Sequence, residues 1–309
     1  MNRYLTLAVC QTGPIQRSAS RVETVGRLVN LLERAAAAGA ELAVFPEMAL
    51  TTFFPRWALD DQREIDAYYE TQMPGPQTQP LYDAGRRLKI GFALGYAELA
   101  YEDGGPHRFN TMDLVGPDGV LIGRYRKMHI PGGEAAEAGV TTHLERRYFE
   151  LGNMGFPVYT YGGVRVGLAL CNDRRWPETY RMLCLNGAQV VLLGYNTPLL
   201  LDEAPGFTHL RMFHNHLSMQ AGAYQNTLWV AAAAKAGIEE GQALIGGSCI
   251  ISPTGEIAAL AMSIDDEVVL HRADLNLIAA CQRVNFNFAH YRRPGEYALI
   301  AERAGPPAP

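Results

Sequence analysis

The sequence predicts an α/β protein whose sheets contain strands of mixed direction. Short apolar runs typical of strands alternate with helical segments, and two similar hairpins occur around residues 117–119 and 253–255. Alternating strands and helices indicate helices layered on a sheet, while hairpins add antiparallel strands to it. The likeness of the two hairpins also suggests a chain built from two related halves.

The first elements read as a strand, a helix and a second strand. LTLAVCQ at residues 5–11 and ELAVFPE at residues 41–47 are the two strand-like runs. Between them, Ser20 and Glu23 have the spacing of a capping box, so we predict a helix that begins there. Proline cannot continue a central strand, so the second strand ends at Pro46 and leaves Glu47 at its carboxyl end.

The rest of the chain continues this alternation. The predicted strands and hairpins are 90–99, 109–127, 164–170, 188–196, 227–234 and 246–261, and the predicted helices are 177–187 and 209–225. Residues 128–145 and 199–209 read as loops, and long loops in compact domains are often functional. Because no linker divides the chain, we predict a single domain over residues 1–309, with a loose tail at about 303–309.

Composition excludes several classes of protein. The 309 residues carry a formal net charge of −5 and no long basic run, so neither nucleic acid nor an anionic membrane is an expected partner. No stretch approaches the roughly 18 apolar residues that span a bilayer, and the N-terminus lacks a signal-peptide core. We therefore predict a soluble, cytoplasmic protein.

The cysteines are consistent with a reducing compartment. The five cysteines are odd in number, widely separated and without C-x-x-C spacing, so the sequence predicts neither a disulfide framework nor a zinc site. Four lie within strand or helix patterns and are expected to be core thiols, namely Cys10, Cys184, Cys249 and Cys281. The fifth, Cys171, ends the apolar run LALC and is followed at once by the polar segment NDRR.

Three reactive side chains occupy the ends of predicted strands. Glu47 and Cys171 each follow a strand, and Lys127 closes a hairpin strand. Sites in α/β proteins assemble at the carboxyl ends of strands, so these side chains are expected to converge. A cysteine nucleophile, a carboxylate that moves protons and a lysine that neutralises an oxyanion together describe hydrolysis of an amide or acyl group. The backbone N–H of Asn172 would be a second donor to the oxyanion.

Each of these residues also has a simpler interpretation. Free cysteine is among the most buried residue types, and a glutamate or lysine taken alone is commonly a solvated surface charge. Their spacing alone does not select them from the whole chain. Their context does, because Glu47, Lys127 and Cys171 lie in turn within the motifs VFPEMALT, YRKMHIP and LALCNDRRWPE.

These three motifs resemble, in order and separation, the catalytic motifs of the carbon–nitrogen hydrolase (nitrilase) superfamily. Within that superfamily, the chain is similar to the N-carbamoyl-D-amino-acid amidohydrolases from Leu7 to about Glu302. The segments that carry this closer likeness are ALTTFFPRW (49–57), YETQMPGP (69–76), GFPVY (155–159), CNDRRWPE (171–178), GYNTP (194–198) and SMQAGAYQN (218–226).

The resemblance implies a four-layer α-β-β-α sandwich and an enzyme that hydrolyses linear amide C–N bonds. It implies that Glu47 is the base, Lys127 the oxyanion stabiliser and Cys171 the nucleophile. Glu145 matches a second glutamate of the superfamily, which orients the lysine. The resemblance implies no metal and no organic cofactor, and it implies a homodimer or homotetramer.

For the substrate, the resemblance implies an N-carbamoyl-D-amino acid, hydrolysed to the D-amino acid, carbon dioxide and ammonia. The implied pocket residues are His143, Asn172, Arg174, Arg175, Asn196 and Thr197. Arginine binds carboxylates through its planar fork, so Arg174 and Arg175 are candidate anchors for the substrate carboxylate. Neighbouring residues in an extended segment face opposite ways, so an anchor made by both requires a turn after Cys171.

Several alternatives stay open. His129 is a further candidate for the substrate pocket, where it would orient the network of Glu47 or Lys127; otherwise it is a loop histidine satisfied by its neighbours. His209, His214 and His216 do not share one helical face, which disfavours a metal site. A β-ureido acid or a simple amide is an alternative substrate. A non-catalytic small-molecule sensor on the same fold would lack at least one reactive residue, and all of them are present.

Overall fold

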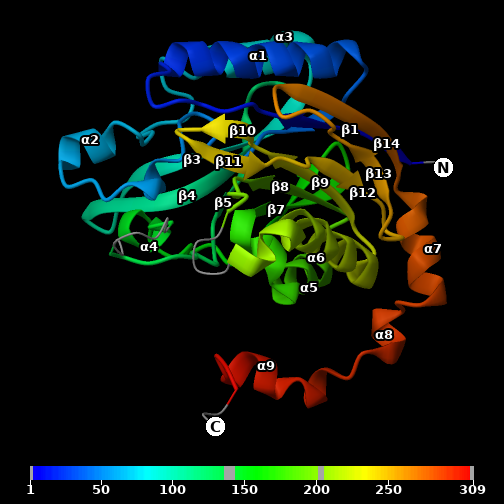
Figure 1. The fold of residues 1–309 in the computed structure, drawn as a ribbon. Helices are drawn as coiled ribbons and strands as arrows, with labels where there is room; N and C mark the ends of the chain where they lie inside the picture. Colours follow the sequence, from blue (N-terminus) through cyan, green and yellow to red (C-terminus); the bar gives the residue numbers. More distant parts are fainter. Residues whose placement is uncertain (1–2, 136–142, 201–204, 307–309) are drawn as a thin grey trace.

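The computed structural model describes residues 3–135, 143–200 and 205–306, which form a layered α/β structure (Figure 1). Two six-stranded mixed sheets lie face to face, and a pair of helices covers the outer face of each. The predicted fold class, a four-layer α-β-β-α sandwich with mixed sheets, is confirmed.

The strands fall into two large sheets and one small ribbon. The first sheet contains, in spatial order, β14 (Glu267–Asp274), β1 (Tyr4–Gln11), β2 (Leu42–Val44), β3 (Gly91–Glu102), β4 (Gly105–Val115) and β5 (Leu121–Arg126). The second contains β13 (Ile257–Leu260), β12 (Cys249–Ile251), β9 (Trp229–Ala234), β8 (Val190–Tyr195), β7 (Val164–Leu170) and β6 (Val158–Tyr161). The ribbon pairs β10 (Ala236–Glu239) with β11 (Gln242–Ile245).

Both sheets share one pattern of strand directions. In the first, β1, β2 and β3 are parallel neighbours, β4 and β5 continue as antiparallel strands, and β14 adds an antiparallel edge. In the second, β7, β8 and β9 are parallel, β12 and β13 continue antiparallel, and β6 adds the antiparallel edge. The two related halves suggested by the hairpins are therefore present in the topology.

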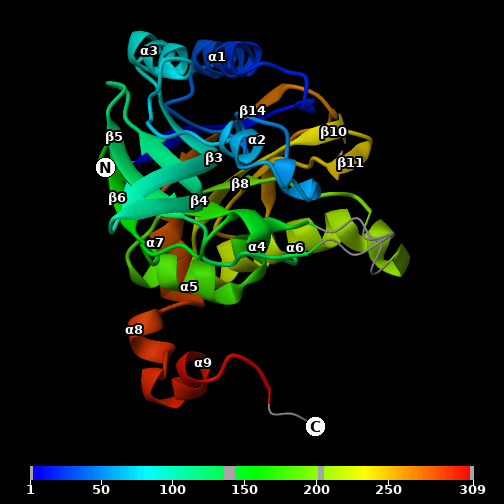
Figure 2. The same cartoon turned by 90° about the vertical axis from the view of Figure 1, so that its left-hand side faces the viewer.

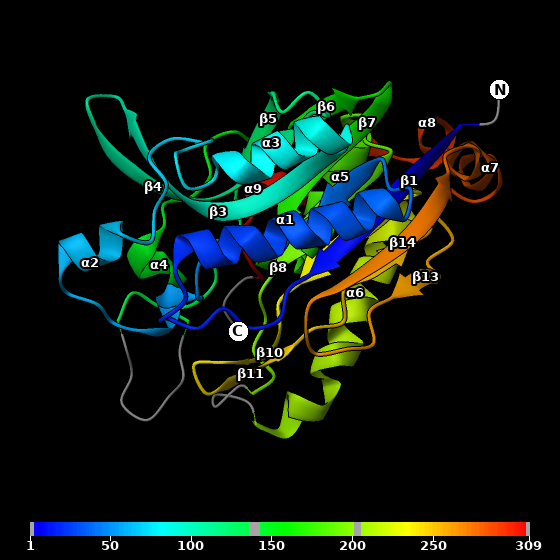
Figure 3. The ribbon, with the colours of Figure 1, turned by 90° about the horizontal axis from the view of Figure 1, so that it is seen from above.

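Four helices form the outer layers. α1 (Arg21–Ala37) and α3 (Gln79–Leu88) lie side by side on the first sheet (Figure 3), and α5 (Pro177–Leu185) and α6 (Arg211–Asn226) cover the second. The capping box that predicts α1 is formed, since the Glu23 N–H donates to Ser20 Oγ at 3.2 Å. The shorter helices are α2 (Gln62–Asp66), α4 (Glu145–Tyr148), α7 (Asn276–Val284), α8 (Phe288–Tyr291) and α9 (Ala298–Glu302), with 3-10 turns η1 (Phe54–Arg56), η2 (Cys171–Arg175), η3 (Pro205–Leu210) and η4 (Pro294–Glu296).

Burial follows the layers. Along β1, Leu7 and Val9 lie in the core between the two sheets, whereas Ala8 and Cys10 lie in the core beneath α1. A strand segment covered on both faces is apolar on both, which explains the continuous apolar run from Leu7 to Cys10. A third core lies beneath α5 and α6 and includes Cys249. The parallel strands are thus rigid supports whose carboxyl ends carry the predicted site.

The structure departs from the sequence predictions at several elements. β4 begins at Gly105, before the predicted hairpin at 109–127. The predicted loop 199–209 includes part of η3. Residues 136–142 and 201–204 of the two predicted loops lie outside the described residues. The ribbon and the helices after residue 275 were not predicted. Of the four predicted core thiols, Cys10 and Cys249 are buried, whereas Cys184 and Cys281 are only partly buried, Cys184 at the margin of the core beneath α5 and α6.

No helix in the described ranges is long and apolar enough to cross a membrane. The cytoplasmic location and the single domain stay predictions. Of the predicted tail, residues 303–306 are exposed and residues 307–309 lie outside the described part.

Candidate active site

Glu47 is clamped where the two sheets meet. Its backbone passes between Gly95 on β3 and Gly194 on β8. A Cβ atom at Gly95 would lie 2.8 Å from Glu47 Cα, and one at Gly194 would lie 2.6 Å from Glu47 N. Contacts this short are not tolerated, so only glycine fits at either position. The carboxylate is therefore held by both halves of the molecule and is fully buried.

Lys127 joins two glutamates directly. Its Nζ donates to Glu47 Oε1 at 2.8 Å and to Glu145 Oε2 at 2.5 Å. Asn110 on β4 donates from Nδ2 to Glu47 Oε1 at 2.7 Å, and its carbonyl accepts from the Lys127 N–H at 2.9 Å. Both oxygens of a carboxylate normally find partners when buried, but Glu47 Oε2 has none among the described residues. One oxygen of Glu47 is thus fixed and the other is available to a reacting group.

The charges of Glu47, Lys127 and Glu145 act strongly on one another because all three side chains are buried. Burial lowers the pKa of Lys127, but the charges of Glu145 and Glu47 outweigh burial, so its pKa lies well above the ordinary value and the lysine stays cationic. Burial raises the pKa of Glu145 to about 7, although Lys127 opposes the shift. A cation held between two carboxylates is suited to stabilising a developing oxyanion, because it is already oriented before the reaction begins.

Cys171 lies at the first position of η2, directly after β7. Its φ of 42° lies in the left-handed region, which costs a non-glycine residue about 1–2 kcal/mol. This tight turn aims the thiol away from the apolar strand that precedes it. The first N–H groups of a helix have no partner within the helix, so the Asn172 N–H is available beside the thiol. The Asn172 side chain itself is tied back, since its Nδ2 donates to the His129 carbonyl at 3.2 Å.

The thiol is surrounded by charged groups of both signs. Burial and then Glu47 raise the pKa of Cys171, whereas Lys127 and Arg174 lower it. The net effect raises the pKa, so the resting form is the thiol and its proton must be removed during attack. Glu47 is the adjacent carboxylate with a free oxygen. The arrangement can therefore perform nucleophilic attack assisted by a general base.

Asp173 holds the η2 turn in place through hydrogen bonds to its carboxylate. Its Oδ2 accepts from the Leu170 N–H at 3.0 Å and from the Tyr125 hydroxyl at 2.8 Å. Its Oδ1 accepts from the His129 N–H at 3.0 Å and pairs with His129 Nδ1 at 2.7 Å. The His129 ring also stacks on Trp176, with centroids 5.2 Å apart. His129 thus contacts Asp173 and Trp176 rather than Glu47 or Lys127, which favours the second of its two interpretations.

Replacing Asp173 with alanine is expected to lower the free energy of unfolding by about 3 kcal/mol, because four hydrogen bonds to a buried carboxylate are lost and their donors stay buried. Urea unfolding measures this loss. Asp118→Ala, which removes an exposed turn carboxylate, is the control and should cost less than about 0.5 kcal/mol. Equal costs for the two variants would contradict the role given to Asp173.

The two arginines after Cys171 differ completely in environment. Arg174 is buried and saturated, since it donates to Asn215 Oδ1 at 2.9 Å, to the Cys171 carbonyl at 2.6 Å and to Thr197 Oγ1 at 2.8 Å. Arg175 reaches solvent and makes no hydrogen bond or ion pair with any described residue. Protein nevertheless surrounds its guanidinium, and desolvation followed by the charge of Arg174 lowers the pKa of Arg175 to about 10. The turn after Cys171 is present, and it turns only Arg175 outward.

Among the remaining predicted pocket residues, Asn196 borders the thiol. Cys171 Sγ lies 3.6 Å from the Asn196 carbonyl. Both side-chain polar atoms of Asn196 are buried without a described partner, so this amide has capacity to bind a ligand. The ring of His143 lies against Phe53, and burial, together with the charges of Arg56 and Lys127, lowers the pKa of His143 to about 3. His143 is therefore neutral at physiological pH.

Comparison with known proteins agrees with this geometry. Residues 6–283 match the family described as "Carbon-nitrogen hydrolase". The chain belongs to the carbon–nitrogen hydrolase family. It is 30% identical to a nitrilase of Pyrococcus abyssi, over 80% of this chain and 82% of the relative. It is 26% identical to N-carbamoylputrescine amidase of Solanum lycopersicum, over 97% and 95%, and 27% identical to the human omega-amidase NIT2, over 86% and 88%.

Solved structures extend the likeness in fold. A carbon–nitrogen hydrolase from Helicobacter pylori G27 superposes with a TM-score of 0.83 at 22% identity, covering 98% of this chain and 99% of that one. An amidase from a Nesterenkonia species gives 0.71 at 19% identity, with 96% of each chain covered. At these identities the comparison speaks for the fold alone. As a member of this family, the chain is a carbon–nitrogen hydrolase.

The sequence patterns did not predict four residues that shape the site of this carbon–nitrogen hydrolase, namely Asn110, Asp173, Arg211 and Asn215. Arg211 donates from Nη2 to the Pro198 carbonyl at 3.0 Å and so anchors the segment that contains Asn196. Asp173 lies within the motif CNDRRWPE, so the sequence could have identified it as a site residue. Asn110 lies in the middle of β4, and no sequence motif around it indicates a role in the site. No group of three His, Cys, Asp or Glu side chains in the described ranges is placed to hold a metal ion.

Proposed function

We propose that this chain hydrolyses N-carbamoyl-D-amino acids to the free D-amino acid, carbon dioxide and ammonia, through a covalent intermediate on Cys171. The observation that carries the proposal is the pairing of two features at one site. Glu47 and Lys127 surround the thiol with the groups that amide hydrolysis needs, and Arg175 supplies an unpaired cation beside them. A substrate with a carbamoyl group for Cys171 and a carboxylate for Arg175 would match both features.

The first half of the reaction forms the covalent intermediate. Glu47 Oε2 takes the thiol proton as Cys171 Sγ attacks the carbamoyl carbon, and the carbonyl electrons move to oxygen. Lys127 Nζ and the Asn172 N–H hold the resulting oxyanion. The tetrahedral intermediate collapses, one C–N bond breaks, and the leaving nitrogen takes the proton from Glu47.

The second half releases the cysteine. Water attacks the carbonyl carbon of the intermediate while Glu47 takes its proton, and the C–S bond breaks to return the thiolate, which recovers that proton. The product of this step is a carbamic acid, which loses carbon dioxide and leaves the second amine. The balance is one water consumed for one amino acid, one carbon dioxide and one ammonia. This sequence holds whichever nitrogen departs first.

Charge at the site favours an anionic substrate. Arg175 has no described partner, and Arg174 and Arg211 lie near enough to lower its pKa further. Three guanidinium groups close to the thiol would repel the cationic amine of N-carbamoylputrescine, the substrate named for one relative. A carboxylate would instead be attracted and bound through the planar fork of Arg175. Preference for the D enantiomer rests on the likeness of the six segments quoted above.

The decisive experiment measures ammonia release from matched N-carbamoyl-D- and N-carbamoyl-L-amino acids, with β-ureidopropionate and a simple aliphatic amide alongside. We expect the N-carbamoyl-D-amino acids to give the largest kcat/KM. A preference for the L series or for the β-ureido acid would refute the enantiomer or the substrate class. Turnover of the simple amide alone would refute the carboxylate anchor.

The same panel tests Arg175. Arg175→Ala is expected to raise KM for the N-carbamoyl acids about 10- to 100-fold, which corresponds to the loss of one charge-assisted contact. The simple amide has no carboxylate, so its KM should change by less than about 3-fold. A loss that is equal for acids and amides would assign Arg175 a structural role instead. Arg146→Ala, an exposed arginine outside the cluster, is the control.

A further inference from the structure

Arg211 is a third arginine beside the thiol, and the proposed reaction gives its guanidinium no role. It is the first residue of α6, and its side chain is partly buried. Desolvation and then the charge of Arg174 lower the pKa of Arg211, whereas the nearby Cys171 raises it. An arginine side chain stays protonated in proteins, so Arg211 is a cation close to the reacting sulfur.

One edge of the Arg211 guanidinium is already fixed. Both Nε and Nη2 donate to the Pro198 carbonyl, at 3.2 Å and 3.0 Å. Nη1 makes no hydrogen bond to any described residue. The edge formed by Nη1 and Nη2 therefore keeps one N–H on each nitrogen for a ligand. A carboxylate is the group that fits this edge, because its two oxygens accept two parallel hydrogen bonds.

The segment that holds this guanidinium is itself held by the ribbon. The Ile245 N–H donates to the Thr197 carbonyl at 3.0 Å, and Pro198 forms an antiparallel bridge with Leu244 on β11. A guanidinium tied to such a support loses little further freedom when it binds a ligand. Arg211 is thus preorganised for binding.

A second side chain of the same segment lacks polar partners. Both polar atoms of the Asn196 amide are without a partner among the described residues, although Asn196 is only 1% exposed. Its backbone carbonyl lies 3.6 Å from Cys171 Sγ, which places the residue beside the thiol. Buried polar groups are normally satisfied, so this amide indicates that a polar molecule binds between the thiol and the segment that Arg211 anchors.

Arg175 and Arg211 are both cations without a described counter-ion. Arg174 is saturated by hydrogen bonds, but neither of the other two forms an ion pair with a described residue. After desolvation and the charge of Arg174, the charge of Arg211 also lowers the pKa of Arg175. Two like charges this close favour a ligand that carries two charges of the opposite sign.

We propose that Arg211 binds a second carboxylate of the substrate, so that the enzyme prefers N-carbamoyl-D-amino acids with an acidic side chain, such as those of aspartate and glutamate. This inference rests on the proposed function, which assigns the carbamoyl group to Cys171 and the α-carboxylate to Arg175. The side chain is the remaining substituent of the α-carbon, and its carboxylate pairs with the Nη1–Nη2 edge of Arg211.

The test compares substrates that differ in a single charge. We expect kcat/KM for N-carbamoyl-D-glutamate and N-carbamoyl-D-aspartate to exceed that for their neutral isosteres, N-carbamoyl-D-glutamine and N-carbamoyl-D-asparagine, by at least about 10-fold, measured as release of the free D-amino acid. Arg211→Met removes the guanidinium and should lower kcat/KM for the acidic substrates about 10- to 100-fold. The neutral isosteres should change by less than about 3-fold.

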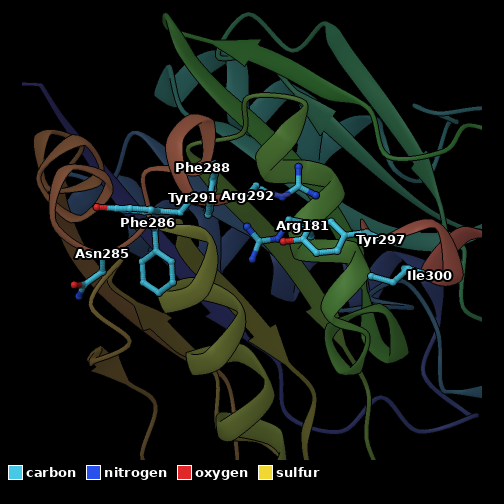
Figure 4. Close-up of a pocket in the computed structure, with 8 residues that line it drawn as sticks. All are labelled: Arg181, Asn285, Phe286, Phe288, Tyr291, Arg292, Tyr297 and Ile300. Atoms are coloured by element: carbon cyan, nitrogen blue, oxygen red, sulfur yellow. The ribbon is translucent and has the colours of Figure 1, made fainter. Parts of the chain in front are cut away.

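Arg181→Met is the matched control. Like Arg211, Arg181 is partly buried, donates to one backbone carbonyl, that of Gln225 at 3.2 Å, and has an Nη1 atom without a described partner. Its guanidinium lies 4.5 Å from the centre of the Phe288 ring (Figure 4). Figure 2 shows α8, which carries this ring, below α5 on the side away from the sheets. This variant should therefore leave the ratio of kcat/KM between acidic and neutral substrates unchanged.

The possible results distinguish this inference from the proposed function. A wild type that hydrolyses the neutral isosteres as well as the acidic substrates would overturn the role of Arg211 and leave the proposed function standing. Equal losses for acidic and neutral substrates in Arg211→Met would also overturn it, because the side chain would then serve only to hold the Pro198 carbonyl. A wild type that releases no D-amino acid from any member of the series would refute the proposed function, and this inference with it.

Discussion

Replacing Cys171 with alanine is expected to lower kcat for ammonia release by at least about 10⁴-fold, the scale seen when a covalent nucleophile is removed. Glu47, Lys127 and the Asn172 N–H would stay in place, but no atom could form the bond to the carbamoyl carbon. Alanine and cysteine have similar backbone preferences, so the turn at φ 42° should survive the change. Turnover measured at saturating substrate separates this loss from any change in binding.

The matched control is Cys249→Ala. Cys249 is also a buried thiol at a strand, but it lies in the core beneath α6 and away from Glu47 and Lys127. Its truncation should cost about 1 kcal/mol of stability through the small cavity created, and it should leave kcat within a few-fold of the wild type. Activity retained in Cys171→Ala, or lost equally in both variants, would remove Cys171 from the chemistry.

The positions of Glu47, Lys127 and Cys171 were predictable because the sequence pattern shows where strands end. An apolar run that stops at a polar residue locates Glu47 and Cys171 at the edge of a sheet, and a hairpin turn locates Lys127. Parallel β2 and β7 bring their carboxyl ends to the junction of the sheets, which is where the structure places all three. Direct contact between Lys127 and Glu145 was available only through the family resemblance, because Glu145 begins a short helix beyond a long loop.

Orientation could not be predicted in the same way. Whether Arg174 or Arg175 faces outward depends on the 3-10 turn after Cys171, and the pattern CNDRR does not reveal that turn. The role of Asn110 depends on pairing between β4 and β5, which sets it beside Lys127. The helices after residue 284 were not predicted for a different reason. They are too short to show a periodic apolar pattern, and they contact the body through single side chains, with Phe286 against Tyr224 and Arg181 over the Phe288 ring.

Replacing Glu47 with glutamine is expected to lower kcat by about 10³-fold, the range attributed to a general base. Glutamine has the shape of glutamate, and its oxygen can still accept from Lys127 Nζ and Asn110 Nδ2. Its amide nitrogen would occupy the position of Oε2, the oxygen without a partner, and cannot take a proton. The substitution therefore preserves the geometry of the cluster and removes only its capacity to move protons.

This design separates two roles for Glu47. If Glu47 served only to orient Lys127, the glutamine oxygen would do the same and kcat would fall by less than about 10-fold. Glu98→Gln is the matched control, since Glu98 is another buried carboxylate, paired with Arg124 and Arg126 on the same sheet. It should lower the melting temperature because a buried ion pair is weakened, yet leave kcat within a few-fold. A large loss of turnover in Glu47→Gln alone, with melting temperature unchanged, would then assign the proton transfer to the free oxygen of Glu47.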